Sequence, residues 1–207
     1  MRSMILFVAN LILGSVAVAD TPTQMSVENL AVNGSGCPVG SVSSSVSPDK
    51  QSVTIYFSDY ISEIGPGIDA VYRRRACQLT FNIKHSPGWR FGLVAFRYQG
   101  IIDLDEGIVA RHRSQYYLQG DPEEFGFVTT MQGPERGTFS FSEQIAPTEV
   151  YWSDCDSNRA INIKTSLRLN ATDQASPEAS GYIGTDSLDA QLGSQEWRLV
   201  WESCSER

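Results

Sequence analysis

The feature that most constrains this chain is a regular alternation of apolar and polar residues. Residues 53–57 read Val-Thr-Ile-Tyr-Phe, and residues 79–83 read Leu-Thr-Phe-Asn-Ile. Successive side chains of a β-strand point to opposite faces, so a period of two gathers the apolar side chains of a segment on one face. Both segments are therefore predicted to be strands with one buried face.

Comparable segments follow one another along most of the chain, separated by turn residues such as Ser86-Pro87-Gly88 and Gly133-Pro134. They occupy residues 42–46, 90–99, 100–104, 108–118, 125–131, 138–141, 161–169 and 197–201. Residues 21–32 show little periodicity and are interpreted as an extended lead-in, and no convincing helical repeat is present. About nine or ten short strands at this spacing predict an all-β fold, an antiparallel β-sandwich or a jelly roll.

The N-terminus has the pattern of a secretory leader. One positive charge at Arg2 precedes a mostly apolar run over residues 4–13, which ends in Ala17-Val18-Ala19. A run of this length is too short for a permanent membrane span, and an Ala-x-Ala end is typical of a cleavage site. We therefore predict a signal peptide over residues 1–19 and a single secreted, extracellular β-domain over residues 20–207.

Four cysteines remain in the exported part of the chain: Cys37, Cys77, Cys155 and Cys204. An even number in a secreted protein indicates two disulfides, and spacing alone leaves three connectivities open. Of these we favour Cys37 with Cys77 and Cys155 with Cys204. No Cys-x-x-Cys pair of the kind found in zinc sites is present, and we predict neither a metal site nor a cofactor.

The formal net charge of -8 limits the classes of partner. An acidic chain has no electrostatic reason to bind nucleic acid or an anionic membrane, and this charge favours solubility. We therefore expect a soluble monomer without nucleic-acid or membrane partners. The basic run Arg73-Arg74-Arg75 is interpreted as a solvated strand edge that discourages pairing between molecules. The two histidines, His85 and His112, are expected at strand ends.

Residues 33–41 are rich in residues that form turns. They lack the lysine and the following helix of a phosphate-binding loop. Glycine permits positive φ and proline fixes φ, so the segment is predicted to turn tightly and present Cys37 to its partner. Asn33 is also an N-glycosylation acceptor, as is Asn170. We predict glycosylation at Asn170 in preference to Asn33.

Several stretches that together contain all four cysteines carry a resemblance to a known family. They are NGSGCPVGSV from Asn33, RRRACQLTFNI from Arg73, PGWRFGLVAFRYQG from Pro87, YWSDC from Tyr151, AINIKTSLRL from Ala160, TDSLD from Thr185 and WESC from Trp201. In this order the chain resembles the small secreted fungal and bacterial proteins grouped as domain of unknown function 4360. The resemblance implies an exported, disulfide-bonded β-domain without an established reaction. The residues before Cys155 depart from it, because a proline is expected there.

Aromatic side chains are the candidates for a binding surface, although most must fill the core of a sandwich. Trp89 follows a Pro-Gly turn and Trp152 lies close to Cys155, so we predict that both are exposed. Together with Tyr98 and Tyr116 they form a predicted aromatic surface on which sugar rings stack.

These observations favour a non-catalytic extracellular domain that binds a polysaccharide or a cell-surface protein, at a cell wall or on another organism in the manner of an effector. Two alternatives stay open. One is a small secreted carbohydrate-active hydrolase with two carboxyl groups held about 5 to 10 Å apart, Asp103 or Glu106 with Glu123 or Glu124. The other is a structural wall or coat protein.

One segment begins like a calcium-binding loop. It reads Asp154-Cys155-Asp156-Ser157-Asn158, but Arg159 and Thr165 stand where an EF-hand loop needs glycine and glutamate. We interpret the segment as a polar turn before a strand.

Overall fold

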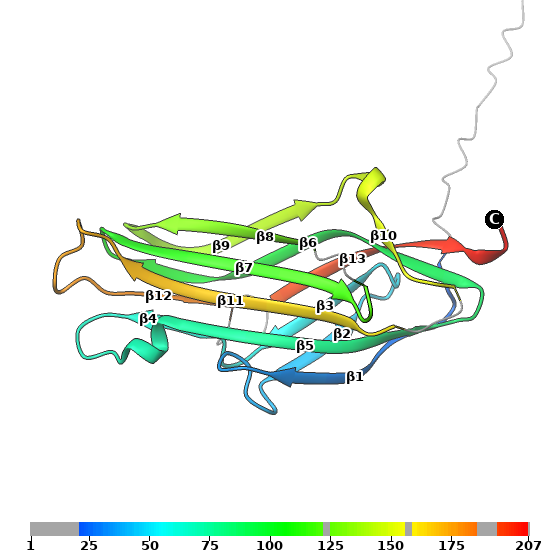
Figure 1. Cartoon of the computed structure of the whole chain (residues 1–207), viewed down its shortest axis with the longest axis horizontal. Coiled ribbons are helices and arrows are strands. Elements are labelled where there is room, and N and C mark those ends of the chain that lie inside the picture. Colours follow the sequence, from blue (N-terminus) through cyan, green and yellow to red (C-terminus); the bar gives the residue numbers. More distant parts are fainter. Residues whose placement is uncertain (1–20, 122–124, 156–158, 186–193, 207) are drawn as a thin grey trace, which may run out of the picture.

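The computed structural model describes residues 21–121, 125–155, 159–185 and 194–206, which form two packed antiparallel sheets without an α-helix (Figure 1). Three short 3-10 helices occupy Ala70–Arg73, Pro147–Glu149 and Cys204–Glu206. No helix in the described ranges is long and apolar enough to cross a membrane. The predicted leader, residues 1–19, lies outside the described residues.

The first sheet has five strands in the spatial order β1-β5-β11-β7-β8. Their bounds are β1 (Met25–Asn33), β5 (Arg74–His85), β11 (Ile161–Ala171), β7 (Ile108–Leu118) and β8 (Phe125–Gln132). The three central strands, β5, β11 and β7, run side by side along the long axis of the molecule (Figure 1).

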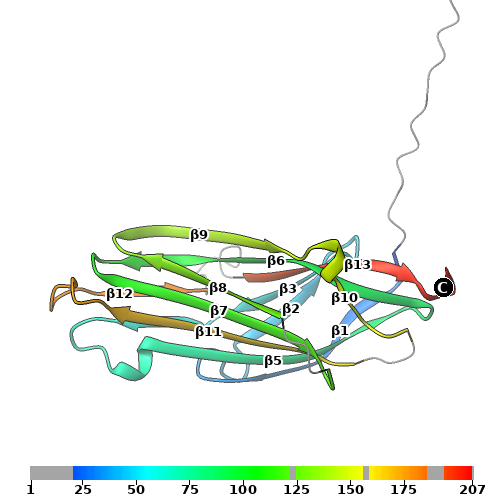
Figure 2. The ribbon, with the colours of Figure 1, turned by 45° about the horizontal axis from the view of Figure 1, so that its top comes forward.

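The second sheet has eight strands arranged around β6 (Trp89–Leu104). The others are β2 (Val42–Val46), β3 (Ser52–Phe57), β4 (Ile61–Ile64), β9 (Glu135–Gln144), β10 (Tyr151–Trp152), β12 (Gly181–Gly184) and β13 (Ser194–Ser203). On one side of β6 lie β13 and β12 in succession, and on the other side lies β9. The turn between β8 and β9 carries the chain from one sheet to the other (Figure 2).

The core lies between the two sheets, where the apolar side chains of the alternating segments meet. Leu79, Phe81 and Ile163 from the first sheet and Ile55 and Trp197 from the second are almost completely buried. Burying one such side chain stabilises a fold by about 1.5–3 kcal/mol relative to exposure. The predicted all-β sandwich with two disulfides is confirmed.

The described residues contain 13 strands, more than the nine or ten predicted. β2 has the predicted bounds, whereas β1 replaces part of the predicted lead-in. The reason is a bulge in β1 between Glu28 and Ala31, where Asn29 has a φ of 56° and shifts the register against β5. A bulge interrupts the period of two, so the sequence pattern of β1 is lost.

The two disulfides join Cys37 to Cys77 and Cys155 to Cys204, the pairing we favoured among the three connectivities. Close approach to Ala76 of β5 and to the ring of Tyr60 explains the two glycines that precede Cys37, Gly34 and Gly36. A Cβ at Gly34 would lie 2.2 Å from the carbonyl oxygen of Ala76, and one at Gly36 would lie 2.2 Å from the ring of Tyr60. The segment is thus a tight turn fixed to β5 by the first disulfide.

Candidate functional site

The four aromatic residues predicted to form a surface do not lie together, and two of them are in the core. Tyr98 and Tyr116 are 0% and 5% exposed. Tyr98 packs edge-on against Phe127, and Tyr116 stacks on Phe96 with ring centroids 4.1 Å apart. The prediction that these tyrosines are exposed is wrong, because the alternation of β6 and β7 points both toward the opposite sheet.

The two tryptophans are half-buried at one end of the eight-stranded sheet. Trp89 has the parity of the buried Phe91 on β6, whereas Trp152 pairs with Gly92 and therefore lies on the opposite face of the sheet. The Arg90 guanidinium covers the Trp152 ring at 4.7 Å. The two indoles therefore do not share one surface, and their part in binding stays a prediction.

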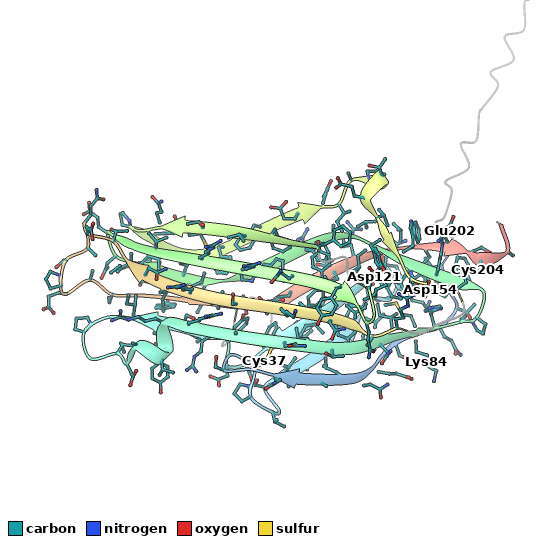
Figure 3. All side chains as sticks on the ribbon, viewed as in Figure 1. Cys37, Lys84, Asp121, Asp154, Glu202 and Cys204 are labelled. Atoms are coloured by element: carbon teal, nitrogen blue, oxygen red, sulfur yellow. A yellow bond between two sulfur atoms is a disulfide. The ribbon has the colours of Figure 1, made fainter. Side chains whose placement is uncertain are left out.

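Of the predicted carboxylate candidates Asp103 and Glu106, Asp103 has a local partner and Glu106 is exposed in the turn after β6. Arg136 donates to Asp103 at 2.9 Å. Asp121 and Asp154 lie near Cys204 (Figure 3), and Arg159 approaches them at 3.8 and 2.6 Å. Glu123 and Glu124 lie outside the described residues, as do residues 156–158 of the candidate calcium loop. The described part of the chain contains no group of three or more His, Cys, Asp or Glu residues placed to hold a metal ion.

The outer face of the five-stranded sheet carries a concentration of positive charge that the sequence analysis missed. Of the 16 lysine and arginine residues of the chain, seven lie on the five strands of this sheet, and of its 24 acidic residues only Glu28 does. Lys84 binds Glu28 at 3.2 Å near one end of the sheet. Five of the other cations point outward from β5, β7 and β11 and define what we call the basic face: Arg74, Arg111, Arg113, Lys164 and Arg168.

Strand register brings the members of the basic face together. Arg168 of β11 lies directly opposite Arg74 of β5 on one side and Arg111 of β7 on the other. Neighbouring strands are about 4.7–4.9 Å apart, so the three arginines form a row across the sheet. Arg113 and Lys164 follow two and four residues farther along their strands, opposite Ser166 and Gln78.

A surface hollow of about 360 Å³ lies within the basic face. Its lining includes Arg74, Arg113 and Lys164 together with the amides of Gln78 and Gln115, and none of its lining residues is acidic. The hollow exists because Ala76 and Ser166 are small and opposite each other in the middle of the sheet. Cations and amides at its rim can donate hydrogen bonds to a bound oxygen-rich ligand.

The arginines of the basic face have no acidic partner among the residues that the structure describes. Among the described carboxylates, none forms an ion pair with Arg74, Arg111 or Arg113. Arg168 donates to the amide oxygen of Asn170 at 3.2 Å, which leaves its charge uncompensated. Lys164 lies 4.7 Å from the centre of the Tyr117 ring, and this cation-π contact orients its ammonium group.

Both predicted glycosylation acceptors lie at the margins of the same face. Asn33 is exposed and lines the hollow beside Gly34, and Asn170 is exposed at the end of β11 next to Arg168. Both positions are accessible to modification in this fold. Glycosylation itself stays a prediction.

The opposite, buried face of the same sheet contains a histidine, His112. His112 lies between Arg111 and Arg113 on β7 but points into the core and is 0% exposed, so the prediction that it lies at a strand end is wrong. Its Nε2 is 3.0 Å from the hydroxyl of Thr165, which also accepts from Tyr60 at 3.3 Å. Burial lowers the pKa of His112 to about 3, so the ring is neutral.

Sequence periodicity contained a signal for the basic face. In β7 the two arginines flank His112, and in β11 Lys164 and Arg168 are separated by four positions, so each pair shares one face of its strand. The sequence did not show that β11 lies between β5 and β7. The interpretation of Arg73-Arg74-Arg75 as an isolated charged edge therefore overlooked the neighbouring cations.

The chain is similar to a curated protein and to several solved structures, including the two that follow. The chain is 32% identical over 187 residues to an uncharacterized secreted protein of Arthroderma benhamiae, covering 90% of this chain and 75% of the relative. TmCBM61 in complex with β-1,4-galactotriose matches 83% of this chain and 89% of its own, with 10% identity and a TM-score of 0.29. A CBM4 structure matches 81% and 86%, with 14% identity and a TM-score of 0.27. These scores are too low to support a common binding site.

Membership of a family follows from the sequence match. The model of a family described as a domain of unknown function, DUF4360, matches residues 23–204, which include both disulfides. The relative is a secreted protein, and this protein is exported. The leader over residues 1–19 stays a prediction. The chain therefore belongs to the DUF4360 family, as the stretches around its cysteines indicated.

Proposed function

We propose that this protein is a non-catalytic extracellular domain that binds a polysaccharide across the outer face of its five-stranded sheet. The observation that carries the proposal is the hollow on this face, which is rimmed by amides and cations and lies on three regular strands. Sites on regular strands hold their side chains more precisely than sites on loops. Sugar hydroxyl groups are matched by Gln78 and Gln115, which both donate and accept hydrogen bonds.

The alternative function as a hydrolase receives no support from this site. Glycoside hydrolysis requires two carboxyl groups on either side of the scissile bond, and no carboxyl group lines the hollow. Asp103, one of the predicted candidates, lies on the other sheet in an ion pair with Arg136. Binding without turnover is therefore the better match to the described geometry.

The proposal is tested by retention of the mature protein on insoluble cell-wall polysaccharides. The variant Gln78→Ala/Gln115→Ala should bind about tenfold more weakly, since each lost hydrogen bond costs about 0.5–1.5 kcal/mol. The matched control, Gln99→Ala/Gln144→Ala, changes two glutamines on the outer face of the other sheet and should bind as the unaltered protein does. Equal loss of retention in both variants would contradict the proposal. It would also be contradicted if the unaltered protein were not retained on any wall polysaccharide and bound no soluble glycan.

The predicted aromatic contribution is separable in the same assay. Trp89→Ala and Trp152→Ala remove indoles that lie outside the hollow. If the outer face of the five-stranded sheet is the binding surface, both variants should be retained as well as the unaltered protein. Loss of retention in either variant would move the site to the eight-stranded sheet.

A further inference from the structure

We propose that the ligand of the basic face is an acidic polysaccharide, whose carboxylate or sulfate groups are bound by its arginines and lysine. This inference rests on the proposed function, because it specifies the ligand class of the same site. It predicts that an acidic protein, with a net charge of -8, binds a polymer of its own sign through one locally basic surface.

The first support is that the row of arginines lowers the stability of the sheet. Like charges directly opposite each other on neighbouring strands destabilise a sheet. Arg168 has an arginine opposite it on both sides, Arg74 and Arg111. A chain with 24 acidic residues places only one of them on the strands of this sheet, and that one is engaged by Lys84. An anionic ligand would reduce the repulsion by supplying negative charge that the described strands of this sheet do not place beside the arginines.

The second support is the chemistry of the side chains. Four of the five cations are arginines, whose planar guanidinium groups bind carboxylate or sulfate oxygens through two parallel hydrogen bonds. The row of Arg74, Arg168 and Arg111 runs across the strands, so it offers three such groups along one line. A linear polymer lying across β5, β11 and β7 would meet them in succession.

The third support separates a saccharide from a nucleic acid. Single-stranded nucleic acids are held by aromatic side chains on which bases stack. No aromatic residue lines the hollow, and the outward-facing Tyr117 of β7 is already covered by the Lys164 ammonium. The hollow is instead lined by amides and by Ser166, which are suited to hydroxyl groups between the charged groups of a polysaccharide.

The test measures binding of the mature protein to four soluble probes. Dextran sulfate and dextran share a backbone and differ in charge, polygalacturonate carries carboxylates in place of sulfates, and single-stranded DNA carries phosphates. We expect binding to dextran sulfate or polygalacturonate, with the stronger of the two identifying the natural charged group. Affinity should fall about tenfold between about 50 and about 300 mM NaCl, because salt screens exposed charges.

Matched variants assign the binding to the basic face. Arg74→Gln/Arg111→Gln/Arg168→Gln should weaken binding of the acidic polymer at least about tenfold, because charge-assisted hydrogen bonds are lost. The control Arg97→Gln/Arg136→Gln/Arg198→Gln removes the same charge from the outer face of the eight-stranded sheet and should bind within about twofold of the unaltered protein. Thermal unfolding of the first variant should occur at the original temperature or higher, which excludes misfolding as the cause of its weaker binding.

The results distinguish the ligand class from the binding function. Equal affinity for dextran and dextran sulfate that is lost in Gln78→Ala/Gln115→Ala would overturn the acidic ligand and leave polysaccharide binding intact. Binding to DNA as strong as to the acidic polysaccharides would overturn the saccharide assignment. Unchanged affinity in the triple arginine variant of the basic face would overturn the assignment of the site. Failure of all four probes and of insoluble wall material would overturn both proposals.

Discussion

The outer faces of the two sheets differ in whether their cations have carboxylate neighbours. On the eight-stranded sheet, cations lie beside acids: Arg90 binds Glu202, Arg136 binds Asp103, and Arg97 stands directly opposite Glu196. On the five-stranded sheet, Arg168 stands between Arg74 and Arg111. None of the three has a carboxylate partner among the described residues.

On the proposal made above, this difference separates a face shaped by stability from a face that binds a ligand. Exposed ion pairs contribute about 0–1 kcal/mol each, but opposite charges across strands at least avoid repulsion. The outer face of the eight-stranded sheet places opposite charges beside each other, and it belongs to the same protein as the basic face. The placement of like charges opposite each other on the five-stranded sheet is therefore a local property of β5, β7 and β11. It favours an interaction with something outside the chain.

The largest expected effect is the loss of stability when a disulfide is removed, and the effect on binding distinguishes the two disulfides. Each closes a loop of similar length, with sequence separations of 40 and 49. Removing either by Cys→Ala pairs should therefore cost about 4 kcal/mol of unfolding free energy in the loop-entropy model. Only Cys37→Ala/Cys77→Ala should also weaken polysaccharide binding, because Cys37 fixes Asn33 and Gly34 at the hollow.

Urea unfolding measures the first quantity, and binding is measured at a temperature where both variants are folded. The variant Cys155→Ala/Cys204→Ala is the control, since Cys204 lies near one end of the molecule and Cys37 near its middle (Figure 3). Identical loss of binding in both variants would show that the hollow does not depend on the segment around Cys37.

A second effect compares the two sides of β7, where Arg111 and Arg113 face solvent and His112 faces the core. In the folded state burial lowers the pKa of His112 to about 3, whereas an unfolded chain has a histidine pKa of about 6.5. The unfolded state then binds more protons between these values, so stability falls as pH is lowered, by about 1.4 kcal/mol per pH unit. From about pH 7 to about pH 5 the loss should be about 2 kcal/mol.

The variant His112→Gln cannot titrate and retains a donor for Thr165, so its stability should change little over this window. Urea unfolding at several pH values measures both slopes. The carboxyl groups of Asp49 and Asp105 do not interfere, because hydrogen bonds from Ser47 and Ser180 lower their pKa values. Their contribution is lost only at more acidic pH. Equal slopes for the two proteins would show that another group controls the response.

The smallest expected effect compares single charge reversals on the two outer faces. Arg111→Glu places an acid opposite Arg168 and should stabilise the fold by about 0.5 kcal/mol, whereas Arg97→Glu places it opposite Glu196 and should destabilise by a similar amount. Thermal unfolding at low salt measures both shifts, and high salt should reduce them. Shifts of the same sign would mean that the two faces do not differ in charge compensation.

Local sequence pattern predicted the strands whose alternation is uninterrupted. Residues 53–57 and 79–83 lie within β3 and β5, and their apolar side chains are in the core. The pattern failed at β1, where the bulge at Asn29 breaks the period, and at β10 and β12, which are too short to show one. It also failed to separate the buried Tyr98 from exposed aromatic residues, because long strands such as β6 have apolar residues of both parities.

The sequence by itself indicated export, the all-β fold and two disulfides, because the pattern of a leader, a period of two and an even number of cysteines are local or compositional features. Only the tertiary structure decided the basic face. Arg74, Arg111 and Arg168 are far apart in the chain and become neighbours when β11 inserts between β5 and β7. Strand order depends on how all the apolar faces pack together, and no short segment contains that information.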